Sequence, residues 1–316
     1  MLVTGATGFV GRHVCARLHA AGMRVRAAVR AAADLPKDWE QVVVGDIGPD
    51  TVWDAALDGV QFVVHLASHS PRDDASAEET AAAFRRVNVA GSECLGRAAV
   101  VAGVRRLVYI STIKVNGEAT PMDAPFTPDM PPRPEDVYGE SKWRAEEILR
   151  GIGAHGGLEV VILRAPLVYG PGVRANFLAL LRLAERGLPV PLGCVRNRRS
   201  MLYVSNLADA ILRCLVAPQA SGQTYLVSDD MDVSTPELME RIAAQLGRKL
   251  RSWPVPVILL RGVGRLTGKN AVIDRLTGSL VIDARKLREQ LEWTPPFTLD
   301  EGLRETVQWY LAERGK

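Results

Sequence analysis

Cysteine is scarce in this sequence. The 316 residues include four cysteines, which are scattered and form no CxxC pair: Cys15, Cys94, Cys194 and Cys214. Isolated cysteines fit small buried side chains in a reducing compartment, and they argue against a disulfide framework or a zinc site. We therefore expect neither disulfides nor a bound metal.

Net charge and aromatic residues are also low, at +3 and 6%. So small a net charge gives no argument for nucleic acid or a membrane surface, and the few aromatics offer no base-stacking platform. No apolar run approaches the ~18 residues of a membrane span. No charged and apolar leader precedes "MLVTGATG", so no secretion signal is predicted. We expect a cytoplasmic protein without a nucleic-acid or membrane partner.

Short apolar runs alternate with helical patterns through the first half of the chain. The runs lie at 2–3, 25–29, 42–44, 62–66, 107–111 and 160–164. Such runs are typical of strands buried on both faces, and their alternation with helices predicts right-handed crossovers and a parallel sheet. The pattern predicts an α/β fold with a doubly wound parallel sheet of the Rossmann type. Because its first strand is so short, we expect the natural chain to begin upstream of Met1.

The regular alternation of strand and helix patterns ends at about residue 165. Ser234 with Glu237, and Thr298 with Glu301, have the spacing of helix N-terminal capping boxes. We predict a Rossmann domain at 1–165, joined by about 200–217, and a smaller C-terminal α/β lobe at 166–199 and 218–316. Between them, segment 117–137 holds six prolines, and a loop of that length is usually a lid or a binding loop.

Three glycines, Gly5, Gly8 and Gly11, lie three residues apart between the first strand and the first helix. Glycines let the backbone approach a pyrophosphate, and a helix N-terminus offers free N–H groups and partial positive charge. A tight turn without a ligand is the alternative. Because the turn follows the first strand and opens an amphipathic helix, it predicts a dinucleotide site.

The ends of the second and third strands bear on the choice of cofactor. Arg30 stands where an acid would bind the ribose 2′-hydroxyl of NAD, and its guanidinium can pair with a 2′-phosphate. NADP is therefore favoured over NAD, although an exposed arginine at a strand end is common. Asp46 could accept a hydrogen bond from the adenine amino group, or it could cap the next helix.

Tyr138 and Lys142 lie four residues apart in "YGESK", within a segment of helical pattern that ends at Gly151. They share one helix face. An ammonium beside a phenol lowers its pKa, which would let Tyr138 exchange a proton with a substrate hydroxyl while hydride moves to or from a nicotinamide. Packing of the ring on the lysine stem is the more usual fate of such a pair. The preceding strand ends in hydroxyls, at the sheet edge where ligands collect, and this favours the chemical interpretation.

At this point the chain resembles a known family, the extended short-chain dehydrogenases/reductases of the nucleotide-sugar epimerase, reductase and dehydratase group. The resemblance covers nearly the whole chain. Its marks are "TGATGFVG", "GDI", "HLAS" (65–68), "VNVAG" (87–91), "STIKVNG" (111–117), "YGESK", "LRAPLVYGPG" (163–172), "RRSMLYVSNLADAI" (198–211) and "LEWTPPFTLDEGL" (291–303).

The resemblance implies a catalytic set of Thr112, Tyr138 and Lys142. Thr112 would hydrogen-bond the substrate oxygen, Tyr138 would be the acid/base, and Lys142 would hold the nicotinamide ribose and tune Tyr138. Ser111 could share the role of Thr112. The implied cofactor-binding residues are Gly5, Thr7, Gly8, Phe9, Val10, Gly11, Arg30, Asp46, Ile47, Leu66, Ala67, Ser68, Asn88 and Lys142.

The resemblance also limits the reaction. Dehydratases of the family carry an Asp-Glu pair after the Ser/Thr, and this chain has Ile113 and Lys114 there, so dehydration is not expected. Oxidoreduction at C4 of the sugar remains, by a 4-epimerase that regenerates its NAD or by a 4-ketoreductase that consumes reduced cofactor. Arg30 tilts the expectation slightly toward the reductase.

The second lobe is expected to bind the nucleotide diphosphate of the substrate, and the resemblance to the family favours UDP as that nucleotide. The family pattern places Asn176, Arg199 and Arg275 on it, and selects Arg199 from a cluster that also holds Arg196 and Arg198. A guanidinium can clamp a pyrophosphate through paired hydrogen bonds, although most arginines are solvated surface charges. A homodimer is expected from the relatives.

Two other functional classes stay open. A reductase of small apolar ketones would share the glycine turn, Tyr138 and Lys142, but it would not need three diphosphate contacts. A non-catalytic NADP-binding sensor would not need the tyrosine and lysine.

Overall fold

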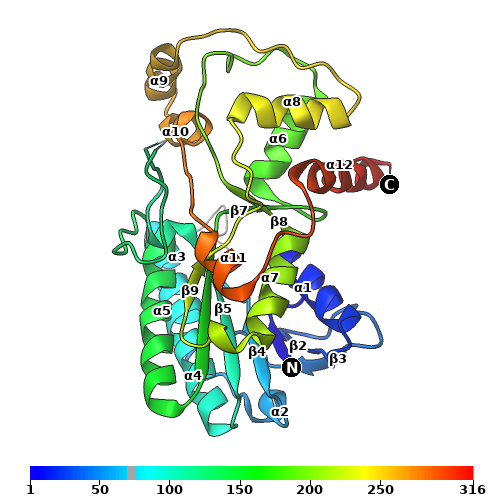
Figure 1. The fold of residues 1–316 in the computed structure, drawn as a ribbon, viewed down its shortest axis with the longest axis vertical. Helices are drawn as coiled ribbons and strands as arrows, with labels where there is room; N and C mark the ends of the chain where they lie inside the picture. The colour runs from blue at the N-terminus through cyan, green and yellow to red at the C-terminus, as the bar shows by residue number, and fades with distance from the viewer. Residues whose placement is uncertain (70–75, 122, 316) are drawn as a thin grey trace.

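The computed structural model describes residues 1–69, 76–121 and 123–315. Within them, seven parallel strands form one sheet in the order β3-β2-β1-β4-β5-β6-β9 (Figure 1). This order confirms the predicted doubly wound Rossmann-type sheet. The strands are β1 (Leu2–Thr4), β2 (Arg26–Val29), β3 (Glu40–Val43), β4 (Phe62–His65), β5 (Arg106–Thr112), β6 (Glu159–Ala165) and β9 (Thr224–Leu226).

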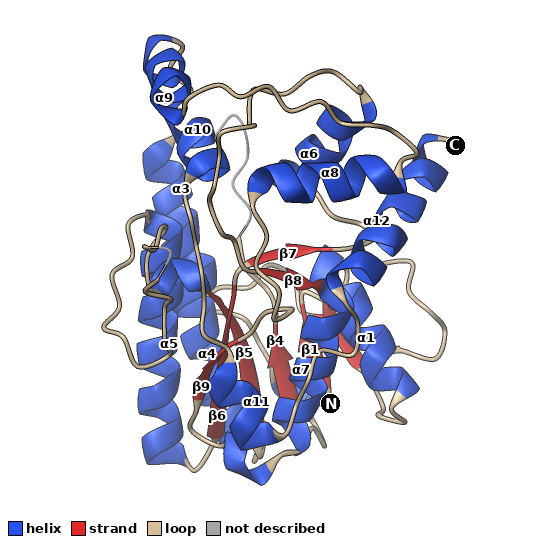
Figure 2. Cartoon of the chain, turned by 45° about the horizontal axis from the view of Figure 1, so that its top comes forward, coloured by secondary structure: helices blue, strands red, loops and turns tan. Residues whose placement is uncertain are grey.

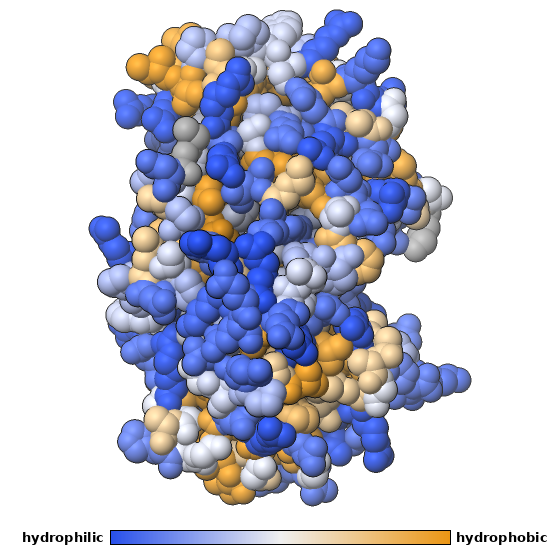
Figure 3. All heavy atoms as spheres, in the orientation of Figure 1, coloured by the Kyte–Doolittle hydropathy of each residue, from blue (hydrophilic) through white to orange (hydrophobic). Residues whose placement is uncertain are grey.

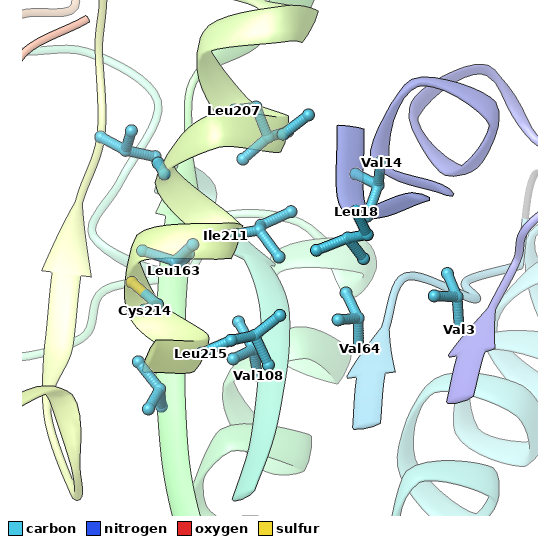
Figure 4. Close-up of a cluster of buried hydrophobic side chains, with 14 of the residues drawn as sticks. Val3, Val14, Leu18, Val64, Val108, Leu163, Leu207, Ile211, Cys214 and Leu215 are labelled. Carbon is cyan, nitrogen blue, oxygen red and sulfur yellow. The ribbon is translucent and has the colours of Figure 1, made fainter. Parts of the chain in front are cut away.

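The central strands are buried on both faces, as their apolar runs predict. Val64, Val108 and Leu163 turn toward one face, where they pack with α1 (Phe9–Ala20) and α7 (Val204–Val216) (Figure 4). Their chain neighbours, such as Leu107 and Ile162, turn to the other face and pack against α4 (Gly91–Val101) and α5 (Val137–Gly156). Successive side chains of a strand point to opposite faces, so an unbroken apolar run fills both layers at once.

Short helices connect these layers. They are α2 (Asp54–Leu57), α3 (Ala77–Phe84), the π-helical η1 (Arg85–Ala90), and the 3-10 turns η2 (Ile113–Val115) and η3 (Pro218–Ala220). The π-helix is continuous with α3 and α4, and such segments are frequent at functional sites.

A second group of elements lies beyond the carboxyl ends of the sheet strands (Figure 2). Strands β7 (Leu167–Tyr169) and β8 (Met201–Tyr203) pair in parallel, and α6 (Ala175–Glu185), α8 (Thr235–Gln245) and α12 (Leu299–Arg314) enclose a separate core with them. Helices α9 (Val257–Leu266) and α10 (Asn270–Thr277) pack against each other at the far end. Ser234 and Thr298 are the N-caps of α8 and α12, as predicted.

The boundary between the two groups differs from the predicted one. Strand β9 and helix α11 (Arg285–Leu291) fall within the range 218–316 that the sequence assigns to the smaller lobe. The structure instead pairs β9 with β6, and Leu287 and Leu291 of α11 join the core of the large sheet. The chain therefore returns to the large sheet after it has formed part of the smaller lobe. The change of sequence pattern near residue 165 does not predict this return.

One local prediction is corrected. Helix α5 does not end at Gly151 but runs to Gly156 and is closed by Gly157 in the left-handed conformation, because Ile152 still packs on the sheet core. Within the proline-rich segment 117–137, Phe126 forms a parallel bridge with Ile282, so the segment is joined to the chain just before α11. None of the helices in the described part of the chain is long and apolar enough to cross a membrane.

Candidate active site

The glycine turn connects β1 to α1 at the carboxyl edge of the sheet. Gly5 has a positive φ of 67°, and a Cβ on Gly11 would lie 2.1 Å from the carbonyl oxygen of Gly5. Gly8 caps α1 in extended conformation without a side-chain hydrogen bond, and no acidic residue lies in the first turn. Neither the N-cap nor the first turn therefore supplies an anion to the N–H groups at this helix end, which fits a phosphate. The predicted residues Thr7, Phe9 and Val10 lie at the same turn.

The loop after β4 is fixed against the turn by a chain of hydrogen bonds. Ala67 N–H donates to Thr4 Oγ1 at 3.1 Å, and Thr4 Oγ1 lies 2.7 Å from His65 Nδ1. His65 Nε2 lies 2.9 Å from the hydroxyl of Ser92, which donates to the Asn88 carbonyl. Complete burial lowers the pKa of His65 to about 3. A neutral His65 therefore orders the loop that holds the predicted residues Leu66, Ala67 and Ser68.

Asn88, on the π-helical segment, connects this loop to the helix that carries Tyr138. Its Oδ1 accepts from Ser68 Oγ at 3.1 Å and from His69 N–H at 2.9 Å, and its Nδ2 donates to Ser141 Oγ at 3.0 Å. The Ser141 hydroxyl donates in turn to the Tyr138 carbonyl. Asn88 is buried, and its hydrogen bonds hold residues 68 and 69, after β4, to helix α5.

Arg30 and Asp46 meet at the edge of the sheet. Arg30 Nε lies 2.6 Å from Asp46 Oδ1, and the two side chains are 81% and 76% exposed. Asp46 does not cap a helix. Because its carboxylate stands beside the guanidinium, the positive charge that favoured a 2′-phosphate is partly neutralised. The neighbouring Ile47 is half-buried and lies against Gly91 at the start of α4.

Tyr138 lies in the first turn of α5, after the N-cap Asp136. Its ring packs 5.5 Å from that of Phe84, measured between centroids. The sequence predicts a lowered pKa for Tyr138, but burial raises it in this structure. A hydrogen bond with Ser68 offsets part of that rise, and the cation that lowers the pKa is Lys114.

Lys142 points toward the sheet beneath Tyr138. Its Nζ lies 4.1 Å from the centroid of the Tyr109 ring, and the side chain is 2% exposed. Burial lowers the pKa of Lys142 to about 7, while the nearby charge of Glu146 raises it. No hydrogen bond of this ammonium is found among the described residues. Among these residues the donors of Lys142 are therefore left without an acceptor.

The two hydroxyls at the end of β5 have different partners. Ser111 donates to Glu146 at 2.5 Å and is committed to the interior. Thr112 Oγ1 accepts only a long hydrogen bond, 3.3 Å, from Lys114 N–H in the described part of the chain. Helix α5 packs against η2, which follows directly after Thr112. Of the two hydroxyl groups, that of Thr112 is therefore the less committed to protein partners in this part of the chain.

The two positions that carry acids in dehydratases hold no acid here. Ile113 is buried in an apolar cluster with Leu226, and Lys114 forms ion pairs with Glu118 and Asp136. Asp136 is thereby occupied with Lys114 and with the N–H of Gly139.

A buried ionic network, which the sequence did not predict, lies beneath the site. Glu146 accepts from Arg164 on β6 and from Arg150 on its own helix, and Arg164 also donates to Asn116 at 3.0 Å. Asn116 donates onward to the Thr127 carbonyl in the proline-rich segment. Two sequence features could have predicted this network: Arg164 ends the apolar run "VVILR", and Glu146 follows Lys142 by four residues.

The three predicted substrate-binding residues come together in the second lobe. Arg199 Nη1 donates to the Arg275 carbonyl at 3.0 Å, and Arg275 Nη1 lies 3.5 Å from Asn176 Oδ1. Burial and the charge of Arg275 both lower the pKa of Arg199. Asn176 follows Ala175, a non-glycine residue with a φ of 50° at the N-terminus of α6. Arg196 and Arg198 turn elsewhere, to the Gly193 carbonyl and to Asp232.

Known proteins are similar to this chain over nearly its full length. A UDP-glucose 4-epimerase from Vibrio cholerae is 41% identical over 318 residues, which cover 100% of this chain and 97% of the relative. The structure resembles MoeE5 in complex with UDP-glucuronic acid and NAD, with a TM-score of 0.77, 27% identity and 99% of each chain covered. It also resembles a UDP-glucose 4-epimerase of Thermus thermophilus in complex with NAD, with a TM-score of 0.75, 25% identity and 98% of each chain covered.

These relatives bear on the expected cofactor and family. Both solved complexes contain NAD, so they do not support the expectation of NADP. Residues 1–228 match the family model described as the NAD dependent epimerase/dehydratase family. Together with the identity to the Vibrio cholerae relative, this match shows that the chain belongs to the NAD dependent epimerase/dehydratase family.

Proposed function

We propose that the protein inverts the configuration at C4 of a UDP-sugar, with NAD as a recycled cofactor and Tyr138 as the acid/base. The name of the Vibrio cholerae relative supports the reaction, and the UDP-sugar bound by MoeE5 supports the substrate class. Ile113 and Lys114 argue against elimination of water, because neither side chain supplies the carboxyl group found at these positions in the dehydratases. The Lys114 ammonium is moreover held by Glu118 and Asp136.

The observation that carries the proposal is the cluster of Asn176, Arg199 and Arg275. Burial lowers the pKa of Arg199, and the positive charge of Arg275 lowers it further because the two guanidinium groups repel each other. A diphosphate between them would remove the repulsion and accept paired hydrogen bonds from both. The N-terminal N–H groups of α6, which have no side-chain cap, would add to the attraction. A reductase of apolar ketones or a non-catalytic sensor would have no use for this cluster.

NAD fits the residues at the first glycine turn. The N-terminus of α1, whose N-cap Gly8 makes no side-chain hydrogen bond, would bind the pyrophosphate, and Lys142 would bind the nicotinamide ribose. Asp46 beside Arg30 would repel a 2′-phosphate, and this weakens the argument for a fresh NADPH in each turnover. The 4-ketoreductase is therefore the weaker alternative.

The chain's own residues would divide the proton chemistry as follows. Thr112 would hydrogen-bond the C4 oxygen and orient it. Tyr138 would accept the proton of the C4 hydroxyl and return it after the sugar has turned over. Lys142 would favour the phenolate by its positive charge. The bound nicotinamide supplies the hydride acceptor and donor. Burial raises the pKa of Tyr138, and in this structure only the hydrogen bond with Ser68 and the charge of Lys114 oppose that rise among the causes of the shift. The phenolate would therefore depend on Lys142 and the bound nicotinamide for further stabilisation.

The test is to incubate the purified protein with UDP-glucose and measure UDP-galactose by anion-exchange chromatography. We expect interconversion without net consumption of cofactor, and Tyr138→Phe should lower kcat by at least about a hundredfold. Tyr310→Phe, on α12, is the matched control and should retain full activity. Stoichiometric oxidation of NADPH by a 4-keto sugar, or a Tyr138→Phe enzyme of full rate, would reject the proposal.

Two further assays address the remaining alternatives. UDP should raise the Tm of the wild-type protein and of Tyr138→Phe alike, which an apolar-ketone reductase would not show. The homodimer is part of this proposal, and light scattering after size-exclusion chromatography measures it directly.

A further inference from the structure

Helix α9 exposes a continuous apolar stripe. Ile258, Leu259, Val263 and Leu266 are between 57% and 90% exposed, and their spacing places them on one side of the helix. The opposite side, with Leu260 and Gly264, is buried against the rest of the lobe. Trp253, just before the helix, is also 61% exposed. Scattered exposed apolar residues need no explanation, but a stripe of four with a tryptophan beside it does.

The same segment is strongly basic. Residues 247–270 contain six lysines and arginines and no aspartate or glutamate, so they carry +6 in a chain of net charge +3. All six are exposed: Arg248, Lys249, Arg251, Arg261, Arg265 and Lys269. Within the part of the chain that the structure describes, only Arg261 has an ion-pair partner, Asp274, at 3.8 Å. The small net charge of the whole chain therefore conceals a local excess.

The stripe and the charges share one end of the molecule. Figure 1 places α9 and the loop that leads to it from α8 at the end of the long axis opposite the large sheet. Figure 3 shows orange, hydrophobic atoms gathered at the same end, with blue side chains around them. A flat partner can meet this end without contacting the Rossmann domain.

The charge pattern selects the partner. A second copy of this chain, joined by a two-fold axis through α9, would oppose +6 with +6, which is unfavourable. Nucleic acid would accept the charges but would leave the aliphatic stripe unpaired, since bases stack on aromatic rings. An anionic lipid surface accepts both, because acyl chains cover the stripe and headgroups pair with the basic residues.

We propose that α9 and the preceding loop dock the protein onto an anionic membrane surface. The helix would lie in the plane of the interface, since ten residues are far too few to span a bilayer. Trp253 would sit at headgroup depth, where tryptophan is enriched. The proposal concerns binding alone, and it holds or fails independently of the reaction proposed above.

The experiment is flotation of the full-length protein with vesicles at low salt. Vesicles of phosphatidylcholine with about one third phosphatidylglycerol should carry the wild-type protein upward, and vesicles of pure phosphatidylcholine should not. Each basic residue near such a surface adds about fivefold to partitioning, so Arg265→Gln with Lys269→Gln should lower binding by at least about tenfold. Raising the salt concentration should weaken binding by screening.

Two matched variants locate the contact. Ile258→Ser with Leu266→Ser should abolish flotation, whereas Val101→Ser with Val216→Ser, which changes exposed valines on α4 and α7, should leave it unchanged. Unaltered Tm values would show that each variant is folded. Equal flotation of all variants, or absence of flotation of the wild type, would overturn the proposal. A change in oligomeric state caused by the α9 variant would overturn it too, because the stripe would then be a contact between copies.

Discussion

The carboxylate of Glu146 accepts hydrogen bonds from the guanidinium of Arg164, the shortest at 2.6 Å, and the two side chains are 0% and 2% exposed. Glu146 lies one helical turn after Lys142 on α5, and Arg164 lies near the end of β6. The pair therefore ties the helix that carries Tyr138 and Lys142 to the sheet, directly beneath the proposed site. Ser111, beside Thr112, donates to the same carboxylate.

Glu146→Gln should lower the free energy of unfolding by about 3–5 kcal/mol, because it leaves the buried charge of Arg164 without a counter-ion. Glu147→Gln is the matched control: its side chain is 58% exposed, and its pairing with Arg150 should contribute no more than about 1 kcal/mol. Urea denaturation of both variants measures the difference. Similar losses in the two variants would mean that the buried pair does not hold the helix to the sheet.

The sequence predicted the sheet and the glycine turn because both depend on local patterns. Apolar runs buried on two faces and a Gly-x-x-Gly-x-x-Gly turn leave a direct record in neighbouring residues. The local sequence does not predict strand β9, because its three residues form a strand only by pairing with the distant strand β6. Pairings between distant segments are decided by tertiary contacts that no local pattern reports.

The electrostatics of the site were harder to predict. The spacing of Tyr138 and Lys142 correctly placed them on one helix, but it could not show that the ammonium turns toward the Tyr109 ring. Nor could it show that Asp46, from a different strand, pairs with Arg30. A pKa depends on burial and on charges brought together by the fold, so motif spacing gives the groups but not their protonation.

Asp46→Asn should shift cofactor preference toward NADP. The substitution removes a negative charge beside Arg30 and frees the guanidinium for a 2′-phosphate. An interaction of about 1 kcal/mol at this exposed site corresponds to about fivefold in the ratio of the NADP and NAD affinities. Fluorescence titration with each dinucleotide measures the ratio. An unchanged ratio, with Arg30→Ala also without effect, would mean that neither residue contacts the adenosine ribose.

Arg199→Gln should weaken UDP binding by at least about tenfold, since a charged hydrogen bond contributes about 1.5–3 kcal/mol. Arg198→Gln is the neighbouring control, because Arg198 pairs with Asp232 at the surface. Calorimetric titration with UDP compares them in the absence of turnover. Equal affinities of the two variants would place the diphosphate away from the cluster of Asn176, Arg199 and Arg275.

His65 should make the protein less stable as the pH falls below 6.5. The folded protein keeps His65 neutral until about pH 3, whereas the unfolded chain takes up the proton near pH 6.5. Between those values the unfolded state binds more protons, so the free energy of unfolding decreases by about 1.4 kcal/mol per pH unit, or about 2 kcal/mol between pH 6.5 and 5. His65→Gln should flatten this dependence, and His155→Gln, at an exposed position on α5, should not. Urea denaturation across this pH range measures the slopes. If wild type and His65→Gln lose stability in parallel, the proton is taken up elsewhere, and His65 does not hold the loop after β4 in its neutral form.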